Sequence, residues 1–503
     1  MRRRAGRGAV AVGVLAGALT AGTFAFGGEE APVAPAVASG GTPSTPLAST
    51  AQTGPRYVSR PDLRPPQVTV HARTGDLAQG PILLAPKRRS TSAGTGALMV
   101  DDAGEPLWFR PNREGMRTND LRVQRYKGKP VLTWWEGRAA GGHGFGYGVI
   151  ADTSYRVIRR VRAKSPYRLD MHEFKLTPRG TALVIIYHTT RRDLRSVGGA
   201  RNGKVIDGII QEIDVETGKV LFHWHSLGKI ALRESYRKVP ESGGQAWDYF
   251  HPNSVDVDSD GNYIVSARYS YSVTKISRRT GRVIWRLGGK RSDFRMGRGT
   301  RFHLAHDAEW QPDGTLRVFD NSQKSIRDRS RVIWLDVDTR RKRVTLEREV
   351  RHPQPVLAAT QANAESLPGG ALFVGWGSQG RWSEFAADGT LRYDAELPTG
   401  YDSYRVYRDS WTGRPSEPPA VAARAQAGAT AVYASWNGAT DVVAWRVLAG
   451  PRPSSLAPIG DAPRQGFETV ITVPGAHAYV KLQALDGSGQ VLGTSRATRV
   501  SAG

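Results

Sequence analysis

The sequence predicts an all-β protein, a six-bladed β-propeller followed by a small C-terminal β-sandwich. Turn residues are abundant, with 57 Gly and 30 Pro, and no long stretch has the periodicity of an amphipathic helix. A turn glycine followed by a β-rich run recurs every ~45–80 residues, as PRGTALVII, SDGNYIVSA, PDGTLRVFD and PGGALFVGW. Such repeats are typical of sheets stacked around an axis, because one sheet cannot bury both of its faces alone.

Length and composition bound the class of protein. With 503 residues, of which 39% are hydrophobic and 23% charged, the chain is long enough for two or three globular domains. It contains no cysteine, which excludes disulfides and lipid attachment through an N-terminal cysteine. The hydrophobic core alone must therefore stabilise the fold.

The first 60 residues differ in composition from the rest of the chain. Arginines at positions 2–4 and 7 precede an apolar run at 9–26, so we interpret residues 1–26 as a signal peptide, with an uncleaved membrane anchor as the alternative. Residues 27–60, rich in Ala, Pro, Ser and Thr, are expected to be a disordered linker. We therefore expect a secreted, extracellular protein that could associate with the cell surface and that contacts a membrane only through this N-terminal segment.

The net charge of +25 lies mostly on residues 61–417, the predicted propeller. A basic surface attracts anions such as sulfate or phosphate esters and anionic cell-surface polymers. A codon or lineage bias toward arginine would produce the same composition. No helix rich in Lys and Arg is present, and a secretion signal argues against nucleic acid as a partner.

We assign six blades to residues 61–417 in chain order. The first three comprise 68–72, 81–86 and 97–109; then 121–137, 146–152 and 154–161; then 174–188 and 209–226. The fourth comprises Ser254–Val257, Tyr263–Ala267, Val273–Ile276 and Val283–Trp285, with Asp-Gly and Thr-Gly turns at 260–261 and 280–281. The last two comprise 305–322, 331–338 and 343–350; then 362–377 and 381–397.

Residues 418–503 are predicted to form a separate module after a Pro-rich boundary. Short β-rich runs alternate with turns, and Trp436 and Trp445 are expected to be the core aromatics of a sandwich that resembles a fibronectin type III or immunoglobulin-like module. The module contains no cluster of chemically active residues. Binding or scaffolding is the role we expect for it.

Histidines precede three of the predicted blades. His172 lies in DMHEF before the third blade, His251 in FHPNS before the fourth, and His303 and His306 in HLAHD before the fifth. The innermost strand of each blade lines the central channel of a propeller, so these positions are expected to converge although they are far apart in sequence. Any one of these histidines would fit a turn cap equally well. Three histidines at matching positions of successive blades predict a functional site.

Arg268 follows the second strand of the fourth blade. Beside three histidines, its planar guanidinium suits a tetrahedral oxyanion, although a solvated or ion-paired strand residue is the alternative. A neutral imidazole can itself be a covalent nucleophile. His143 lies in a Gly-rich run that is expected to be a flexible rim loop, whereas His188, His223 and His225 are expected to pack within strands.

A metal is an alternative use of the same histidines. Asp170, Glu173 and Asp307 flank them and could contribute carboxylate ligands to a zinc or other divalent ion. The three histidines lack the local spacing of the common zinc motifs. The sequence therefore predicts neither a metal nor a cofactor.

Several motifs together resemble the arylsulfotransferase (ASST) family, in its actinobacterial and fungal branch. They are DMHEFKLTPRGTALVI, QEIDVETGKVLFHWHSL, WDYFHPNSVDVDSDGNYIVSARYS, GRVIWRLGG and AHDAEWQPDGTLRVFDN, and the likeness covers residues 68–419. The resemblance implies a six-bladed propeller that transfers a sulfuryl group from a phenolic sulfate ester, the donor, to a phenolic acceptor. It also implies independence from the nucleotide donor 3′-phosphoadenylyl sulfate.

The resemblance assigns roles to individual residues. His306 corresponds to the histidine that is transiently sulfated in the family, with the neighbouring His303 as the alternative. His251, Arg268 and His172 correspond to the residues that hold the sulfuryl oxygens. Further substrate contacts are predicted in the same motifs, at His303, Asn253 and Asp307.

Two other functions compete with this one. The basic surface and the C-terminal module would also suit a non-catalytic propeller that binds anionic cell-surface glycans. The histidines and carboxylates would suit a metal- or quinone-dependent propeller enzyme.

Overall fold

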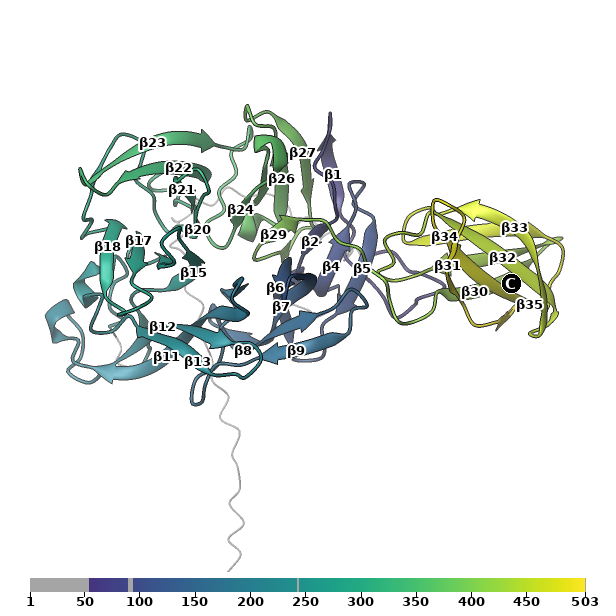
Figure 1. Ribbon diagram of the computed structural model, residues 1–503, viewed down its shortest axis with the longest axis horizontal. Helices are drawn as coiled ribbons and strands as arrows, with labels where there is room; N and C mark the ends of the chain where they lie inside the picture. The colour runs from purple at the N-terminus through teal and green to yellow at the C-terminus, as the bar shows by residue number, and fades with distance from the viewer. Residues whose placement is uncertain (1–53, 89–93, 242–243, 503) are drawn as a thin grey trace, which may run out of the picture. The chain divides into compact units, whose positions relative to one another are not determined.

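The computed structural model describes residues 54–88, 94–241 and 244–502, and within them the fold is all-β (Figure 1). Apart from strands, these residues form only four short 3₁₀ segments: η1 (Arg195–Val197), η2 (Leu232–Glu234), η3 (Pro368–Gly370) and η4 (Gly377–Gln379). The all-β prediction is confirmed. None of the helices in these residues has the length and apolarity needed to cross a lipid bilayer.

Six sheets, antiparallel except where β14 and β19 pair in parallel, together with one two-stranded pair, account for the strands before residue 412. The first two sheets contain β29 (Val406–Arg408), β2 (Ile82–Leu84), β4 (Gly96–Val100) and β5 (Pro106–Pro111); then β6 (Arg117–Tyr126), β7 (Lys129–Ala140), β8 (His143–Ala151) and β9 (Val157–Val161). The third contains β10 (Phe174–Leu176), β11 (Thr181–Arg192), β12 (Gly203–Asp214) and β13 (Val220–His225), with β14 (Trp247–Asp248) beside β12.

The remaining sheets follow in chain order. The fourth contains β15 (Pro252–Val257), β16 (Tyr263–Ala267), β17 (Ser272–Ile276) and β18 (Val283–Gly288). The fifth contains β20 (His306–Trp310), β21 (Leu316–Asp320), β22 (Arg331–Asp338), β23 (Arg343–Val350) and β19 (Arg295–Met296). The sixth contains β24 (Asn363–Ser366), β25 (Leu372–Gly375), β26 (Arg381–Phe385), β27 (Leu391–Glu396) and β1 (Thr69–Arg73), and the two-stranded pair is β3 (Lys87–Arg88) with β28 (Tyr401–Asp402).

The sheets are arranged in a propeller-like ring, with the first strand of each toward a common centre (Figure 1). Neighbouring sheets contact one another through β6 and β10, β11 and β15, β15 and β20, β20 and β24, and β24 and β29. The ring closes through β29 and β6. Strands that start different sheets therefore meet although they are distant in sequence.

The structure corrects the membership of the first predicted blade. The strand predicted at 68–72 is β1, which pairs with β27 in the last sheet rather than with 81–86. The place beside β2 is taken instead by β29, which comes from the end of the ring segment. The two ends of this segment are thus hydrogen-bonded into each other's sheets, an exchange that a reading in chain order cannot detect.

Hydrophobic clusters fill the spaces between neighbouring sheets. Trp135 of the second sheet packs in one cluster with Val184 and Ile209 of the third. Trp224 of the third sheet shares the next cluster with Val265 of the fourth. Each sheet therefore buries its faces against the neighbouring sheets. A ring was predicted from the repeats because one sheet cannot bury both of its faces alone.

Residues 420–499 form two further sheets with a common core. One contains β30 (Ala420–Gln426), β31 (Ala429–Ser435) and β34 (Glu468–Pro474); the other contains β33 (Ser455–Pro463), β32 (Ala444–Arg452), β35 (Tyr479–Leu485), β36 (Val491–Thr494) and β37 (Thr498–Arg499). Trp445 lies at the centre of this core, only 1% exposed. Trp436, predicted to be its partner, is half-buried at the edge and donates its indole N–H to the Glu417 carbonyl.

The predicted linker ends earlier than residue 60. Tyr57 is buried against Phe467, with ring centroids 4.4 Å apart, and the Val58 N–H donates to Glu468 at 3.0 Å. Residues 54–60 therefore pack against the C-terminal sheets, which corrects that part of the disorder prediction. The predicted signal peptide, 1–26, and the linker residues up to 53 lie outside the described residues.

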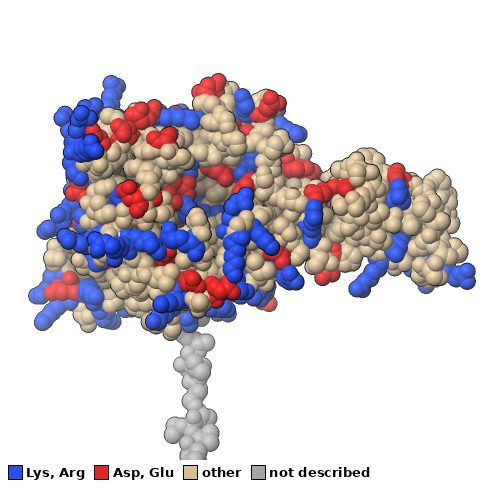
Figure 2. Space-filling model, in the orientation of Figure 1, with Lys and Arg blue, Asp and Glu red and all other residues tan. Residues whose placement is uncertain are grey.

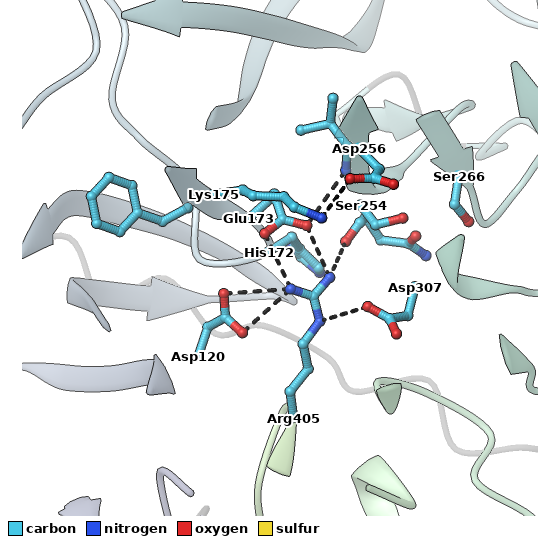
Figure 3. Close-up of polar contacts among 12 residues, drawn as sticks. Asp120, His172, Glu173, Lys175, Ser254, Asp256, Ser266, Asp307 and Arg405 are labelled. Atoms are coloured by element: carbon cyan, nitrogen blue, oxygen red, sulfur yellow. Dashed lines mark hydrogen bonds and ion pairs between the residues drawn. The ribbon is translucent and has the colours of Figure 1, made fainter. Parts of the chain in front are cut away.

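Arg405 holds a buried ion network at the centre of the ring (Figure 3). Its guanidinium is fully buried and contacts Glu173 at 3.1 Å, Asp120 at 3.3 Å and Asp307 at 3.6 Å. Arg122 also pairs with Glu173, at 2.6 Å. Asp120 and Arg122 lie within β6 and Asp307 within β20, while Glu173 and Arg405 directly precede β10 and β29, so the network joins the inner strands of four sheets.

Replacement of Arg405 by Met should destabilise the protein by about 3–5 kcal/mol, because it leaves buried carboxylates without their cation. The matched control is Arg446→Ala, which breaks an exposed ion pair with Asp461 and should cost no more than ~1 kcal/mol. Urea unfolding of both variants, followed by tryptophan fluorescence, measures the difference. Equal losses in the two variants would contradict a structural role for the network.

Candidate active site

One cavity of about 380 Å³ is lined by all four residues predicted to be catalytic. His172 lies two residues before β10, His251 directly before β15, His306 at the first position of β20, and Arg268 directly after β16. The three histidines are at most 7% exposed. The predicted convergence of residues that are distant in sequence is therefore observed.

Backbone hydrogen bonds hold the loop that carries His251. Its φ of 54° lies in the left-handed region, which costs energy for a residue with a side chain. The Arg268 N–H donates to the His251 carbonyl at 2.9 Å, and the Tyr269 N–H donates to the Phe250 carbonyl at 3.1 Å. The same two bonds place Arg268 beside His251.

His172 and His251 each have a carboxylate partner. The Nδ1 of His251 lies 2.5 Å from Asp248, and the Nδ1 of His172 contacts Asp170, whose carboxylate also accepts the His172 backbone N–H at 2.9 Å. The two imidazole rings lie nearly perpendicular, with centroids 4.9 Å apart. Because a carboxylate can only accept, both Nδ1 atoms carry protons, and the free Nε2 atoms are available to a ligand.

Asp248 is shared between two histidines. It accepts from His251 and from the Nε2 of His143, at 2.9 Å. Burial lowers the pKa of His251 to about 4 although Asp248 opposes the shift. Burial would also lower the pKa of His143, but the hydrogen bond and charge of Asp248 outweigh it and raise this pKa. His143 thus lies in the ordered strand β8, not on the flexible rim loop that its glycine neighbours predicted.

His306 has a neutral partner instead of a carboxylate. Its Nδ1 lies 2.8 Å from the side-chain oxygen of Asn321 and 3.1 Å from the Leu304 carbonyl. The Asn321 amide N–H₂ donates to the Ala358 and Gln361 carbonyls, at 2.7 and 2.9 Å, which fixes the oxygen toward His306. Nδ1 therefore carries the proton of the neutral ring, and the Nε2 lone pair is left as an acceptor whose protein contact is a long one, with the Gln361 N–H at 3.3 Å.

The surroundings of His306 also favour its neutral form. Burial and the positive charge of Arg268 lower its pKa well below the ordinary value of 6.5, and the bond to Asn321 offsets only part of this shift. Arg268 itself is half-buried, and its guanidinium donates to the Ala359 carbonyl at 3.0 Å. The site therefore contains a neutral imidazole next to a cation.

Three predicted substrate contacts lie elsewhere. Asp307 is turned to the ion network below the cavity, where it pairs with Arg405 and accepts the Ala364 N–H at 2.9 Å. Asn253 is fully buried and donates to the Ala305 carbonyl at 2.8 Å. His303 packs edge-on against Tyr271, with centroids 5.4 Å apart. None of the three lines the cavity, and of the two neighbouring histidines only His306 does.

Other lining residues were not predicted from the sequence. Tyr404 lies between His172 and His306, with centroids 5.4 and 6.4 Å from theirs, and Tyr269 lies 5.0 Å from His251. The remaining polar side chains of the wall are Lys87, Arg88, Arg117, Thr360, Gln361 and Asp402. Four of these unpredicted residues, Lys87, Arg88, Asp402 and Tyr404, belong to β3, β28 and the segment before β29, outside the repeats, so the blade pattern gave no signal for them.

One group of side chains in the described residues has the geometry for a metal ion. The ligand atoms of His143, Asp248 and His251 lie within 4.8 Å of one another. Asp248 already accepts from both histidines, and a metal at this position would replace these two hydrogen bonds. The same atoms thus complete a hydrogen-bonded group without a metal.

Replacing Asn321 by Asp should raise the pKa of His306, because a carboxylate at Nδ1 stabilises the imidazolium. Histidine ¹⁵N NMR across a pH titration reports both the tautomer and the pKa. In the native protein we expect the Nδ1–H tautomer and no protonation of His306 above pH 6.5. An Nε2–H tautomer, or an unchanged pKa in Asn321→Asp, would contradict the assignment.

The fold and site define a propeller-like β protein with a histidine and arginine cavity, and the comparisons give its family. The model of the arylsulfotransferase (ASST) family matches residues 122–397, more than half of the chain. The chain belongs to this family. No curated protein matches it.

Solved structures match with low similarity. A protein of unknown function from Bacteroides caccae is 14% identical, with a TM-score of 0.41, and the match covers 66% of this chain and all of that one. Virginiamycin B lyase from Staphylococcus aureus is 11% identical, with a TM-score of 0.30 and coverage of 65% and 87%. The β-propeller domain of Swd1 from Myceliophteria thermophila is 13% identical, with a TM-score of 0.32 and coverage of 65% and 95%.

Proposed function

We propose that this protein is an arylsulfate sulfotransferase that moves a sulfuryl group from a phenolic sulfate ester to a phenolic acceptor, with His306 as the group that is transiently sulfated. Membership of the family supports the general activity. The observation that supports the residue assignment is the Nδ1–H tautomer of His306, which leaves Nε2 as a nucleophile in a cavity shared with Arg268.

The reaction proceeds by two displacements at sulfur. In the first, the Nε2 lone pair of His306 forms an N–S bond while the bond from sulfur to the phenolic oxygen breaks, and the phenolate leaves with the electron pair. In the second, the acceptor phenol gives its proton to the imidazole that protonated the first phenolate, its oxygen attacks the same sulfur, the N–S bond breaks, and the electron pair of that bond returns to Nε2. A new sulfate ester forms, and no external donor of electrons or nucleotide is needed.

Arg268, His172 and His251 would hold the oxygens of the transferring group. The fork of Arg268 suits a tetrahedral oxyanion. A bound sulfate ester places negative charge beside His251 and favours its protonated form, so the free Nε2 would become a donor when substrate enters. In that form the histidine could also protonate the leaving phenolate.

The cavity wall suits an aromatic anion. Tyr404 and Tyr269 offer ring surface to a phenyl group, and Lys87, Arg88 and Arg117 add positive charge around it. Basic side chains are also spread widely over the face of the ring shown in Figure 2, with acidic ones among them. This charge would bring anionic esters, and anionic cell-surface polymers, toward the protein.

The proposal extends to organisation and location. We interpret the six ring sheets as the six blades of a β-propeller at residues 61–417, and the two sheets of 418–503 as a fibronectin type III-like or immunoglobulin-like sandwich that binds or positions a partner. The predicted signal peptide, residues 1–26, supports secretion.

Intact-protein mass spectrometry tests the covalent step. Mixing the protein with 4-nitrophenyl sulfate should add about 80 Da, the mass of one SO₃ group, in an acid-labile form. The adduct should be absent from His306→Asn and present in the surface control His477→Asn. Retention of near-native transfer to phenol by His306→Asn would refute the assignment.

The pH dependence of transfer tests the role of Arg268. Because the neutral form of His306 reacts, activity should fall only as the pH drops through a pKa well below 6.5. Arg268→Met should move this acid limb to higher pH and lower the rate about a hundredfold or more, since an oxyanion contact is lost. Arg268→Lys keeps the charge, so it should lower the rate and leave the acid limb in place. If the acid limb of Arg268→Met stayed at the pH of the native protein, the charge of Arg268 would not be what lowers the pKa of His306.

A further inference from the structure

A second group of histidines lies on the third sheet, away from the cavity. His223 and His225 are alternate residues of β13, so their side chains leave the strand on the same side. β13 is the outermost strand of the β10–β13 run. His223 is exposed, and the side chain of His225 is 40% exposed, so the sequence prediction that both pack within the protein is wrong.

The two imidazoles face each other through the same ring atom. The Nε2 of His223 lies 2.8 Å from the Nε2 of His225. The Nδ1 of His225 lies 2.6 Å from Asp207, and the Nδ1 of His223 lies 3.0 Å from the amide of Gln211. Register places Gln211 directly opposite His223 on β12, so both partners are supplied by the neighbouring strand.

The partners of the pair are held rigidly. Asp207 is 5% exposed and also accepts from the hydroxyl of Ser226 at 3.0 Å and the N–H of Leu227 at 3.1 Å. Gln211 is fully buried. Since Asp207 can only accept, it fixes the proton of neutral His225 on Nδ1 and leaves a lone pair on Nε2. This is the arrangement in which a carboxylate orients a metal-binding histidine.

A hydrogen bond between the rings requires one proton at the shared position. As the amide of Gln211 is placed, it donates to His223, whose own proton is then on Nε2 and points to His225. The other side-chain atom of Gln211, its oxygen, has only a long contact, 3.5 Å, with the Lys164 N–H. Rotation of this amide would let it accept from Nδ1 of His223 and turn both Nε2 lone pairs toward one point, with no proton gained or lost.

We propose that His223 and His225 bind a divalent transition-metal ion, such as Cu²⁺, Ni²⁺ or Zn²⁺, through their Nε2 atoms. Imidazole nitrogen suits these ions, which bind histidine at ~2.0–2.1 Å, and two such bonds span a separation close to that of the two nitrogens. Water completes the coordination, because the pair is open to solvent. The ion takes the place of the shared proton, which moves to Nδ1 of His223.

The other groups around the pair determine what else the ion meets. Tyr167 packs over it, with its ring 5.3 Å from His223 and 6.4 Å from His225, and His188 packs edge-on against the same tyrosine, 5.2 Å from its ring. Lys164 is the nearby cation and opposes metal binding. Asp207 supplies the compensating negative charge. Two neutral imidazole ligands and one nearby carboxylate therefore face the charge of the bound ion.

Titration of the full-length protein with Cu²⁺ tests the proposal, because copper binds such ligands most tightly among these ions and reports nitrogen ligands by EPR. We expect one equivalent with a two-nitrogen hyperfine pattern. His223→Gln and His225→Gln should each abolish this signal, and Asp207→Asn should weaken binding about tenfold or more. The exposed His477→Gln and the cavity variant His143→Gln are controls that should leave it unchanged.

Loss of the signal in His143→Gln but not in His223→Gln would overturn the proposal, since the ion would then occupy the cavity histidines. The absence of any saturable copper binding would do the same and would show that the pair is joined only by its hydrogen bond. Thermal unfolding of each variant without metal distinguishes these results from misfolding. Zn²⁺ should stabilise the native protein and not His225→Gln.

Discussion

The buried charge of Arg405 is the constraint on which the site depends. A fully buried guanidinium must be compensated on all sides, and the groups that do so are Glu173, Asp120, Asp307 and the Asn253 carbonyl, at 3.3 Å. Several of these are sequence neighbours of site histidines (Figure 3). Glu173 follows His172, and Asp307 follows His306. The network therefore positions the loops that carry the imidazoles, and the same pairing that joins the sheets sets the geometry of the cavity.

Neighbouring residues of one loop face different surroundings. His172 and His306 line the cavity, whereas the residues that follow them, Glu173 and Asp307, pair with Arg405 in the network. The sequence placed Asp307 and Asn253 in the site because they share motifs with its histidines. Proximity in sequence does identify the loop, but it does not distinguish the side of the loop that faces the substrate. That distinction depends on which inner strands surround each residue, and thus on the whole ring.

Local patterns predicted local structure well. All four strands of the 254–285 unit occur at the expected places, because turn glycines and β-rich runs are read within one sheet. The exchange of β1 and β29 between the ends of the ring was missed, since pairing between residues about 300 positions apart leaves no local signal. Tyr404 was missed for the same reason, because it reaches the histidines from the segment before β29, at the far end of the ring segment. Asn321 follows β21, the strand paired with the β20 of His306, and the local pattern did not show that its side chain faces the imidazole.

The three cavity histidines differ in the partner at Nδ1, and this difference separates their chemistry. His172 and His251 contact carboxylates at Nδ1, and the charge of Asp248 favours the imidazolium of His251 once an anion is bound. His306 contacts an amide that is locked by two carbonyls, so its proton position is fixed but its charge is not stabilised. In the proposed mechanism, His172 and His251 hold the sulfuryl oxygens, His251 also protonates the leaving phenolate, and His306 attacks the sulfur. In this proposal, the identity of one buried side chain, amide against carboxylate, separates the roles of residues of the same type in one cavity.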